Sequence, residues 1–287
     1  MKQQHSTPAD RRDAIYLLGF SPRTSDRLRA AIASVLPMID CRSHGNVDAW
    51  FVRVPREQFE GADAEKNLAD IQWLSPRVMA HQQAVEQLSR ELPFYPAHFG
   101  TLFSDLSRLF ELIDANRRTL TEYFAGEARH VEWGVKVFVA WSRAVDAFRQ
   151  SGDDGDSDTN GAGLNYLRRK KMIRQRDQAV RRWIDETLAV LREEVQALAV
   201  RCCDRPTAVG GEDGDWECIA NLAVLMPWQR QFELQQWIES KHAIRADTSR
   251  MLTFQLTGPW PLYSFIPPLV PAASHETAGT HWVGSAA

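Results

Sequence analysis

A run of nine residues near the middle of the chain, VEWGVKVFV, alternates with a period of two. One set of positions holds Val131, Trp133, Val135, Val137 and Val139, and the other holds Glu132, Gly134, Lys136 and Phe138. Successive side chains of a β-strand point to opposite faces of a sheet, so this pattern predicts a half-buried strand. We expect Gly134 to mark a bulge or a close approach of two backbones.

The residues before this strand predict a domain of their own. A buried strand at 14–20 precedes a helix capped by Ser25, and two short strands, MIDCR (38–42) and WFVRVP (50–55), follow. A long helix is expected to begin at Ser75 and Pro76, with an extended segment, FYPAHFGTLF (94–103), after it. The order β-α-β-β-α-β is typical of a ferredoxin-like domain, in which helices cover one face of an antiparallel sheet.

The residues after the central strand predict a second sheet. A long helix carries an apolar stripe made of Ile173, Val180, Ile184, Leu188, Leu191, Val195 and Leu198. A strand at 216–226 follows, then a helix at 228–242 with Phe232 and Trp237 or Ile238 facing inward, and a last strand at 250–258. This order indicates a second ferredoxin-like domain that is degenerate in one strand, with a short extra strand near Thr207 to Val209 as an option.

The chain is therefore expected to be an α+β protein of two ferredoxin-like domains, which suits its length of 287 residues. We expect residues 1–103 to form the first domain, and 104–126 a linking helix capped by Ser104 or Asp105. Residues 127–257 would form the second domain, and 258–287 a C-terminal tail rich in aromatic residues and proline.

Composition argues against several classes of function. The formal net charge of −3 disfavours a general nucleic-acid binder. No apolar run approaches the roughly 18 residues of a membrane helix, and the polar N-terminus lacks the apolar region of a secretory signal, so we expect a cytoplasmic protein without a membrane contact. The four cysteines, Cys41, Cys202, Cys203 and Cys218, lack the spacing of a zinc site and are expected to be buried thiols, with no metal or cofactor bound.

Two charged segments adjoin each other in the second half. The acidic stretch at 151–163 matches the start of a calcium loop at Asp156 and Asp158, but Leu167 stands where the loop needs a bidentate glutamate, so a solvated loop is expected. The basic run LRRKKMIRQR, residues 167–176, opens an amphipathic helix. It is expected to be a solvated face that the acidic stretch partly neutralises, with contact to an acidic protein surface and phosphate binding as alternatives.

Motifs of known catalytic sites are missing from the sequence: it contains no G-x-S-x-G, P-loop, H-E-x-x-H or G-x-G-x-x-G. His98 lies beside apolar residues and is expected to be structural. Glu132 and Lys136 share one face of their strand and are expected to form a surface ion pair, which implies no chemistry. No catalytic residue is therefore assigned.

The C-terminal stretch LTGPWPLYSFIPP, residues 256–268, combines prolines with Trp260, Tyr263 and Phe265. Aromatic side chains supply contact area in cores and interfaces. We expect this stretch to lie along an apolar groove of the second domain, either as a latch within the chain or as part of a surface for a partner. The strands at 131–140 and 250–258 are further candidates, because an edge strand can accept a partner strand.

Four blocks together resemble the gas vesicle protein family GvpF/GvpL. They are FGTLF (99–103), VEWGVKVFV (131–139), GLNYLRRKK (163–171) and LTGPWPLYSF (256–265), in family order from about residue 92 onward. Two positions depart from the family pattern: His98 takes the place of an arginine, and Leu262 that of a second proline. A role that needs a permanent charge at residue 98, and the rigidity of the tail, are in question as a result.

The resemblance implies a two-domain protein without enzymatic activity that takes part in gas vesicle assembly. Its implied partners are the small hydrophobic shell protein, whose aggregation it would prevent, and other gas vesicle accessory proteins, either in the cytoplasm or as a minor part of the vesicle. The expected partner-binding residues are Trp260, Tyr263, Phe265, Trp133, Lys136, Arg168 and Arg169. The alternatives are an enzyme or small-ligand-binding protein on tandem ferredoxin-like domains, and a nucleic-acid binder that uses residues 168–182.

Overall fold

The computed structural model describes residues 13–149, 162–207, 215–243 and 251–271, and they form two compact units. The first unit holds the described residues up to Val131 together with those from Trp260 onward. The second unit holds the described residues from Glu132 to Pro259. The chain therefore leaves the first unit along one strand and returns to it along another. Each unit is described by itself below.

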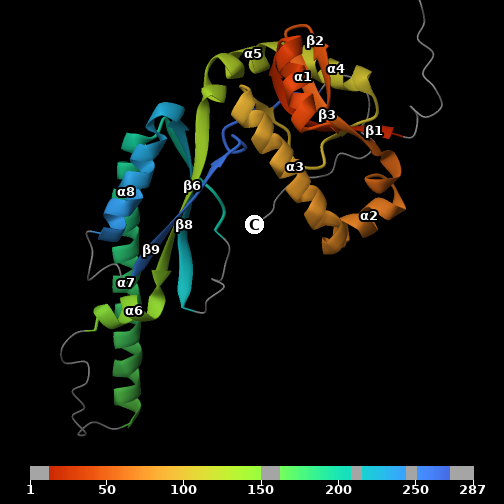
Figure 1. The fold of residues 1–287 in the computed structure, drawn as a ribbon. Helices are drawn as coiled ribbons and strands as arrows, with labels where there is room; N and C mark the ends of the chain where they lie inside the picture. Colours follow the sequence, from red (N-terminus) through yellow and green to blue (C-terminus); the bar gives the residue numbers. More distant parts are fainter. Residues whose placement is uncertain (1–12, 150–161, 208–214, 244–250, 272–287) are drawn as a thin grey trace, which may run out of the picture. The chain divides into compact units, whose positions relative to one another are not determined.

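The first unit is built on an antiparallel sheet in the order β2-β3-β1-β4, with β5 also paired to β1 (Figure 1). Its strands are β1 (Asp13–Pro22), β2 (Asp40–His44), β3 (Val47–Pro55), β4 (Tyr95–Pro96) and β5 (Leu102–Phe103). Strand β1 is central and buried over most of its length, because it pairs on both sides. The expected strand at 14–20 is thus confirmed and extended at both ends.

Helices and short helical turns complete the first unit. They are α1 (Asp26–Val35), α2 (Ala62–Ala69), α3 (Ile71–Glu91), α4 (Leu106–Ala115) and α5 (Arg117–Ala125), with 3-10 turns η2 (Arg56–Gln58) and η3 (Glu127–Arg129). Ser25 caps α1 as expected, its hydroxyl accepting from the Leu28 N–H at 3.3 Å. The inner faces of α1 and α3 bury Ile32, Val85 and Leu88 in one cluster with aromatic side chains of the sheet.

The start of α3 differs from the expectation. The helix begins at Ile71, where the Asp70 carboxylate caps it by accepting from the Gln72 N–H at 2.9 Å. Pro76 lies inside the helix, so a helix start at Ser75 and Pro76 is wrong. Proline inside a helix removes one hydrogen bond and crowds the carbonyl four residues before it, and the buried inner face of α3 outweighs this cost.

The segment expected to link the domains as one helix is two helices, α4 and α5, which meet at Asn116. The Asp105 carboxylate caps α4 by accepting from the Arg108 N–H at 3.1 Å. Leu109, Ile113 and Leu120 are fully buried, and both helices belong to the first unit. The apolar stripe in this segment therefore serves the core of that unit.

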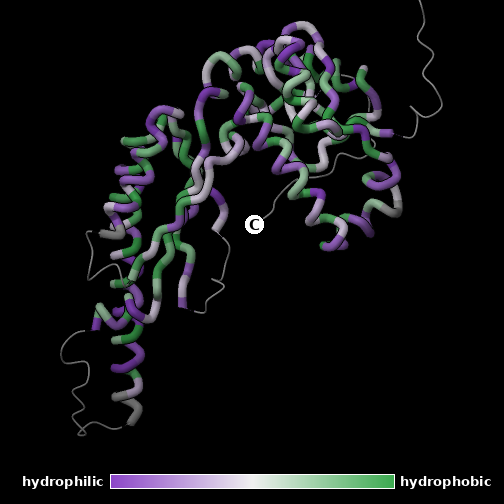
Figure 2. Tube along the Cα trace, viewed as in Figure 1, coloured by the Kyte–Doolittle hydropathy of each residue, from purple (hydrophilic) through white to green (hydrophobic). Residues whose placement is uncertain are grey.

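The second unit holds a four-stranded sheet in the order β7-β8-β6-β9. Its elements are β6 (His130–Ala140), α6 (Trp141–Ala147), α7 (Ala162–Leu198), β7 (Arg201–Asp204), β8 (Trp216–Pro227), the 3-10 turn η4 (Trp228–Arg230), α8 (Gln231–Ala243) and β9 (Leu252–Trp260). The short strand β7 precedes the position expected for an extra strand, of which residues 208 and 209 lie outside the described residues. Figure 2 shows a long hydrophobic stretch along β8, a strand that pairs on both sides.

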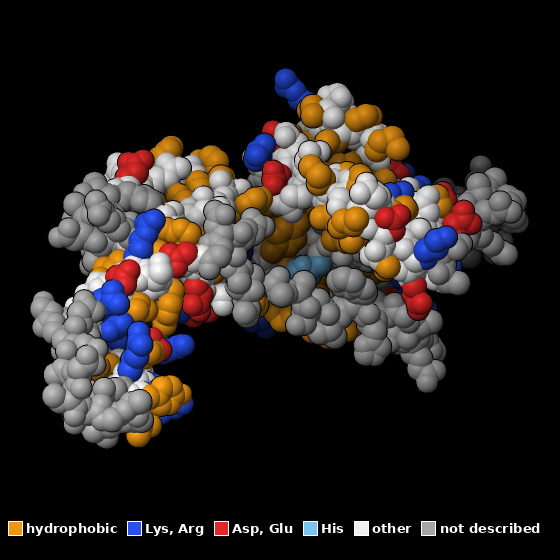
Figure 3. Space-filling model, turned by 90° about the horizontal axis from the view of Figure 1, so that it is seen from below, with side chains coloured by type: hydrophobic (Ala, Val, Ile, Leu, Met, Phe, Trp, Pro, Cys, Tyr) orange, Lys and Arg blue, Asp and Glu red, His pale blue; other side chains and the backbone are white. Residues whose placement is uncertain are grey.

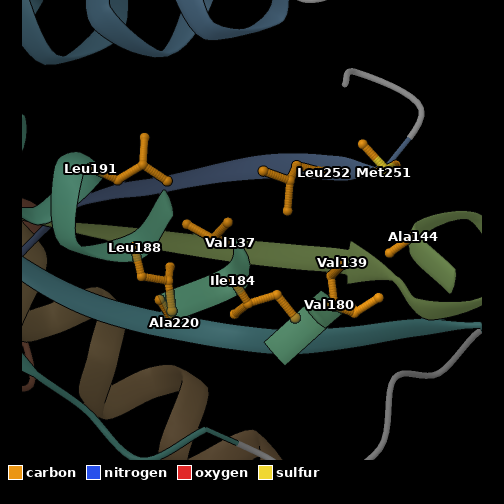
Figure 4. Packing of buried hydrophobic residues seen from close by; sticks show 10 residues of the cluster. All are labelled: Val137, Val139, Ala144, Val180, Ile184, Leu188, Leu191, Ala220, Met251 and Leu252. Atoms are coloured by element: carbon orange, nitrogen blue, oxygen red, sulfur yellow. The ribbon is translucent and has the colours of Figure 1, made fainter. Parts of the chain in front are cut away.

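The core of the second unit forms between the sheet and α7 (Figure 4). Val180, Ile184, Leu188 and Leu191 of α7 cluster with Val137 and Val139 of β6, which confirms most of the expected stripe. Ile238 of α8 is buried as expected, but Phe232, also expected to face inward, is 62% exposed, and Leu234 is buried in its place. Phe232 lies two residues before Leu234, about 200° away around the helix, so the two cannot share a face.

Strand β6 lies between β8 and β9, and it is buried on both faces from Val131 to Val135, while Lys136 and Phe138 are half-buried. A central strand has no open edge, so the expectation that residues 131–140 could receive a partner strand is wrong. Glu132 is fully buried and pairs with Arg205, and the expected surface pair with Lys136 is wrong as well. A buried carboxylate needs such a partner, because burying an unpaired charge is costly.

At Gly134 the close neighbour is a side chain, and not a second backbone as expected. A Cβ atom at this position would lie 2.5 Å from Oγ1 of Thr257 on the neighbouring strand β9. Only glycine fits here, because real Cβ contacts are not this short. The VEWG and LTGPW blocks are thus spatial neighbours that depend on each other.

We predict that Gly134→Ala destabilises the protein by about 1–3 kcal/mol, because the new methyl group overlaps the Thr257 hydroxyl. Thr257→Ala removes that oxygen, and the next atoms, Arg205 Nη1 and the Thr257 carbonyl oxygen, lie at 3.6 and 3.8 Å. Urea unfolding of both single variants and the double variant should therefore show a coupling of about 1 kcal/mol or more. Additive effects would contradict the assigned contact.

Candidate functional site

The C-terminal segment, residues 260–271, belongs to the first unit. Leu262 and Phe265 are 5% and 3% exposed, and the Tyr263 ring packs against the cluster formed by α1, α3 and the sheet. The expected position in a groove of the second domain is therefore wrong. The reason is that β9 ends at Trp260 and the chain then passes back to the first unit.

Two side chains of the first unit hold the main chain of this segment. The Tyr95 hydroxyl donates to the Pro267 carbonyl at 2.8 Å. The Asn116 side chain donates from Nδ2 to the Val270 carbonyl at 2.8 Å and accepts from the Val270 N–H at 2.7 Å. Asn116 is 2% exposed, so this buried amide satisfies both main-chain groups of Val270 as a neighbouring strand would.

Asn116 also explains the break between α4 and α5. Its backbone N–H still closes α4 by donating to Leu112 and Ile113, and its carbonyl accepts from Leu120 in α5. The side chain is thereby fixed at the junction and directed at the C-terminal segment. No sequence signal in the apolar stripe marked this residue, because its function depends on a partner 154 positions away.

An aromatic and histidine cluster receives Tyr263. The Tyr263 ring stacks on His98, with ring centroids 5.8 Å apart, and its hydroxyl lies 3.4 Å from His81 Nε2. His81 Nε2 also lies 3.2 Å from the Ala97 carbonyl, which can only accept, so Nε2 carries the proton. Nδ1 then accepts from the Tyr16 hydroxyl at 3.0 Å, and that hydroxyl accepts from the Gly100 N–H.

Burial keeps His81 and the nearby Tyr95 uncharged. It lowers the pKa of His81 from 6.5 to about 4, with repulsion from His98 adding to the effect and the Ala97 hydrogen bond opposing it. It raises the pKa of Tyr95 to about 12. At neutral pH these two side chains therefore carry no charge, and the hydrogen bonds of the cluster fix its geometry.

The residues expected to bind a partner lie on several elements, in both units. Trp260, Tyr263 and Phe265 lie in the C-terminal segment, whereas Trp133 and Lys136 lie on β6, and Arg168 and Arg169 lie on α7. Trp133 is only 5% exposed, Lys136 is half-buried, and both arginines are exposed. Trp260 is 36% exposed, the most of the three aromatics.

The described residues show no cluster of three or more His, Cys, Asp or Glu side chains that could hold a metal ion. Burial raises the pKa of Cys41 to about 12 and that of Cys202 to about 11, so these thiols stay protonated. An open depression of the first unit is lined by charged side chains, including Arg117 and Arg118, which pair with Asp114 and Glu122. In the described part of the chain, no helix has the length and hydropathy to cross a membrane.

The depressed pKa of His81 predicts acid sensitivity. Above pH 6.5 His81 is neutral in both the folded and the unfolded chain. As the pH drops below 6.5, the unfolded chain takes up the proton first, so the free energy of unfolding decreases. The loss should reach about 3 kcal/mol near pH 4, where the folded protein also takes up the proton. Chemical unfolding from pH 7 to 4 should show this component in the wild type and in His98→Gln, and not in His81→Gln. An unchanged pH profile for His81→Gln would contradict it.

Comparison with known proteins agrees with the arrangement of elements. The chain is 26% identical over 227 residues to gas vesicle protein L of Streptomyces sp. (strain CB03234). This alignment covers 77% of this chain and 80% of that protein. The fold is similar to the crystal structure of GvpF from Anabaena sp. PCC7120, with a TM-score of 0.63, 16% identity, and coverage of 92% of this chain and 100% of that one.

The GvpF crystal structure from Microcystis aeruginosa gives a TM-score of 0.59 at 18% identity, covering 89% of this chain and 99% of that one. These similarities show a mixed fold of helices and two antiparallel sheets. The family model of the gas vesicle synthesis protein GvpL/GvpF matches residues 14–267, and this chain belongs to that family.

Proposed function

We propose that this chain acts in gas vesicle assembly by binding the small hydrophobic shell protein and preventing its aggregation, without catalysing a reaction. The observation that carries the proposal is the family match over residues 14–267. Other accessory proteins of the vesicle are proposed as further partners, and the gas vesicle and the cytoplasm as the places of action.

Physical chemistry explains why such a helper is needed. A shell that keeps liquid water out of its gas space must be built from strongly apolar subunits. Before assembly these subunits expose large apolar patches, which drive aggregation. A helper must cover such a patch with a surface that carries few charges, because each charge facing an apolar partner would lose its water without gaining a counter-ion.

The outer face of α3 has these properties. Ile71, Val78 and Met79 are 63%, 39% and 61% exposed, and their spacing places them on one side of the helix. Between Ile71 and Val85 the only charged residue is Arg77, whose guanidinium lies 3.9 Å over the Trp73 ring. We therefore propose this face as the contact for the shell protein, since interface centres are depleted in charge and enriched in methionine.

The aromatic residues of the C-terminal segment have a different proposed role. Phe265 and Leu262 are buried, so they could contact a partner only after leaving the first unit. We propose that the segment is a latch that fixes the first unit, and that Trp260, the most exposed of its three aromatics, offers surface to a partner. On the second sheet, Lys136 is the candidate on β6, since Trp133 is buried.

We infer that both units are ferredoxin-like. Counted in chain order within each unit, the third strand lies between the second and the first, and the fourth strand pairs with the other side of the first. The orders are β2-β3-β1-β4 in the first unit and β7-β8-β6-β9 in the second. Because β7 is present, the second unit has the same four strand positions as the first. This favours a complete ferredoxin-like domain over one that lacks a strand.

The proposed shell contact predicts the effect of adding a charge. Met79→Lys should lose at least about 1.4 kcal/mol of binding, a tenfold weaker affinity, because the ammonium group would be desolvated against an apolar partner. The measurement is light scattering after shell protein is diluted from denaturant, with and without the helper. Val190→Lys, at another exposed apolar position (53%) on α7, is the matched control and should protect like the wild type. Equal protection by Met79→Lys would rule out this face.

The latch predicts a stability effect that is separate from binding. Asn116→Ala should cost about 2 kcal/mol and lower the Tm by several degrees, because both main-chain groups of Val270 lose their partner. Well below its Tm, this variant should still suppress shell-protein scattering. A variant with the wild-type Tm that no longer protects the shell protein would instead assign the segment to the partner surface.

A further inference from the structure

Helix α7 has 37 residues, and its amino-terminal turns extend past the end of the sheet in its own unit (Figure 1). Every residue from 166 to 175 is exposed, whereas Val180 and Val195 are fully buried. The carboxy-terminal part of the helix thus belongs to the core of the second unit, and the part from 166 to 175 does not. We call residues 166–175 the α7 extension.

The apolar stripe of the core continues onto the α7 extension. Tyr166, Ile173 and Val180 are seven residues apart, which places them on one side of a helix. Val180 is buried in the core, but Ile173 is 49% exposed and Tyr166 is 64% exposed. The stripe therefore ends in an apolar seam with no cover from the described residues.

Cations surround this seam. The α7 extension carries Arg168, Arg169, Lys170, Lys171 and Arg174, and no acidic residue occurs between Ala162 and Arg176. None of these five cations forms an ion pair with another described residue. Lys170 and Arg174 are four apart, as are Lys170 and Tyr166, and the Lys170 Nζ lies 6.0 Å over the Tyr166 ring. Like charges at this spacing destabilise a helix, so the arrangement favours an acidic neighbour.

We propose that the α7 extension is a docking surface for an acidic amphipathic helix of a partner protein. The partner's apolar side chains would cover Tyr166 and Ile173, and its carboxylates would pair with Arg169 and Lys170. Those two cations flank the seam on opposite sides, since each lies three residues from one seam residue and four from the other. Figure 3 shows blue Lys and Arg side chains beside orange apolar ones in the part of the molecule that holds α7.

A partner helix fits these residues better than a membrane or a nucleic acid does. A helix that lies on a membrane separates its apolar face from its cations, whereas here Arg169 and Lys170 lie directly beside the apolar seam. A nucleic acid would place phosphates against the exposed seam, and the chain as a whole has a net charge of −3. An acidic helix satisfies both the seam and the cations on each side of it.

The test uses the full chain and a labelled synthetic peptide of several heptads, with leucine at the seam positions and glutamate beside them. A second peptide carries glutamine for every glutamate. Fluorescence anisotropy should show binding of the glutamate peptide and at least about tenfold weaker binding of the glutamine peptide, since each lost charge-assisted pair weakens the complex. Circular dichroism of each protein variant verifies that its helix content is unchanged.

The α7 extension supplies its own matched control. Arg169→Gln/Lys170→Gln should weaken binding of the glutamate peptide about tenfold, while Arg168→Gln/Lys171→Gln, with the same loss of charge on the other side, should weaken it less than about threefold. Equal weakening by both variants would overturn the proposal, because it would leave only a diffuse charge effect. So would equal binding of the two peptides, or no binding of either.

Three other occupants are outcomes of the same experiment. Tighter binding of phosphatidylglycerol vesicles, or of a short DNA duplex, than of the glutamate peptide would overturn the proposal in favour of a membrane or a nucleic acid. Binding of the peptide only after Asp153, Asp154, Asp156 and Asp158 are changed to asparagine would assign the surface to this chain's own acidic stretch. Loss of shell-protein protection by Met79→Lys alone leaves this proposal untouched, so the two surfaces are tested independently.

Discussion

The burial of β6 on both faces is the constraint on which the second unit depends. A central strand brings its neighbours close, and at Gly134 the neighbour is so close that any side chain would overlap Thr257 of β9. The same burial forces Glu132 to find a counter-ion, which Arg205 supplies. Two sequence blocks more than a hundred residues apart, VEWG and LTGPW, are therefore parts of one packing arrangement.

The return of the chain after β9 gives the first unit a component that its own segment of sequence lacks. Phe265 and Leu262 complete the apolar packing, Tyr263 covers the histidine cluster, and Asn116 holds the main chain of Val270. Such bonds to the backbone do not depend on the side chain at residue 270. Leu262 and Phe265 are thus part of a core, and this explains why a stretch rich in proline also carries a buried aromatic side chain.

The two proposed contact surfaces, the outer face of α3 and the α7 extension, differ in charge. The outer face of α3 is apolar and nearly free of charge, which suits an apolar partner, whereas the α7 extension mixes apolar side chains with unpaired cations, which suits an acidic one. An assembly helper that meets more than one partner benefits from surfaces of different chemistry, because a partner suited to one is disfavoured at the other. Membership of the GvpL/GvpF family gives both surfaces a common biological setting.

The sequence by itself determined the elements whose signal is local: the period-two alternation of β6, the Ser25 cap, the stripe of α7 and the need for glycine at residue 134. It also identified the family through four short blocks. Only the tertiary structure decided which unit receives the C-terminal segment, that Glu132 pairs with Arg205, and that Asn116 and His81 contact residues more than 150 positions away. Helical and strand periodicity reports which side of an element is apolar, but not which surface will cover it. That choice is made by packing between distant segments, and for this reason the partner of each buried face could not be predicted from the sequence.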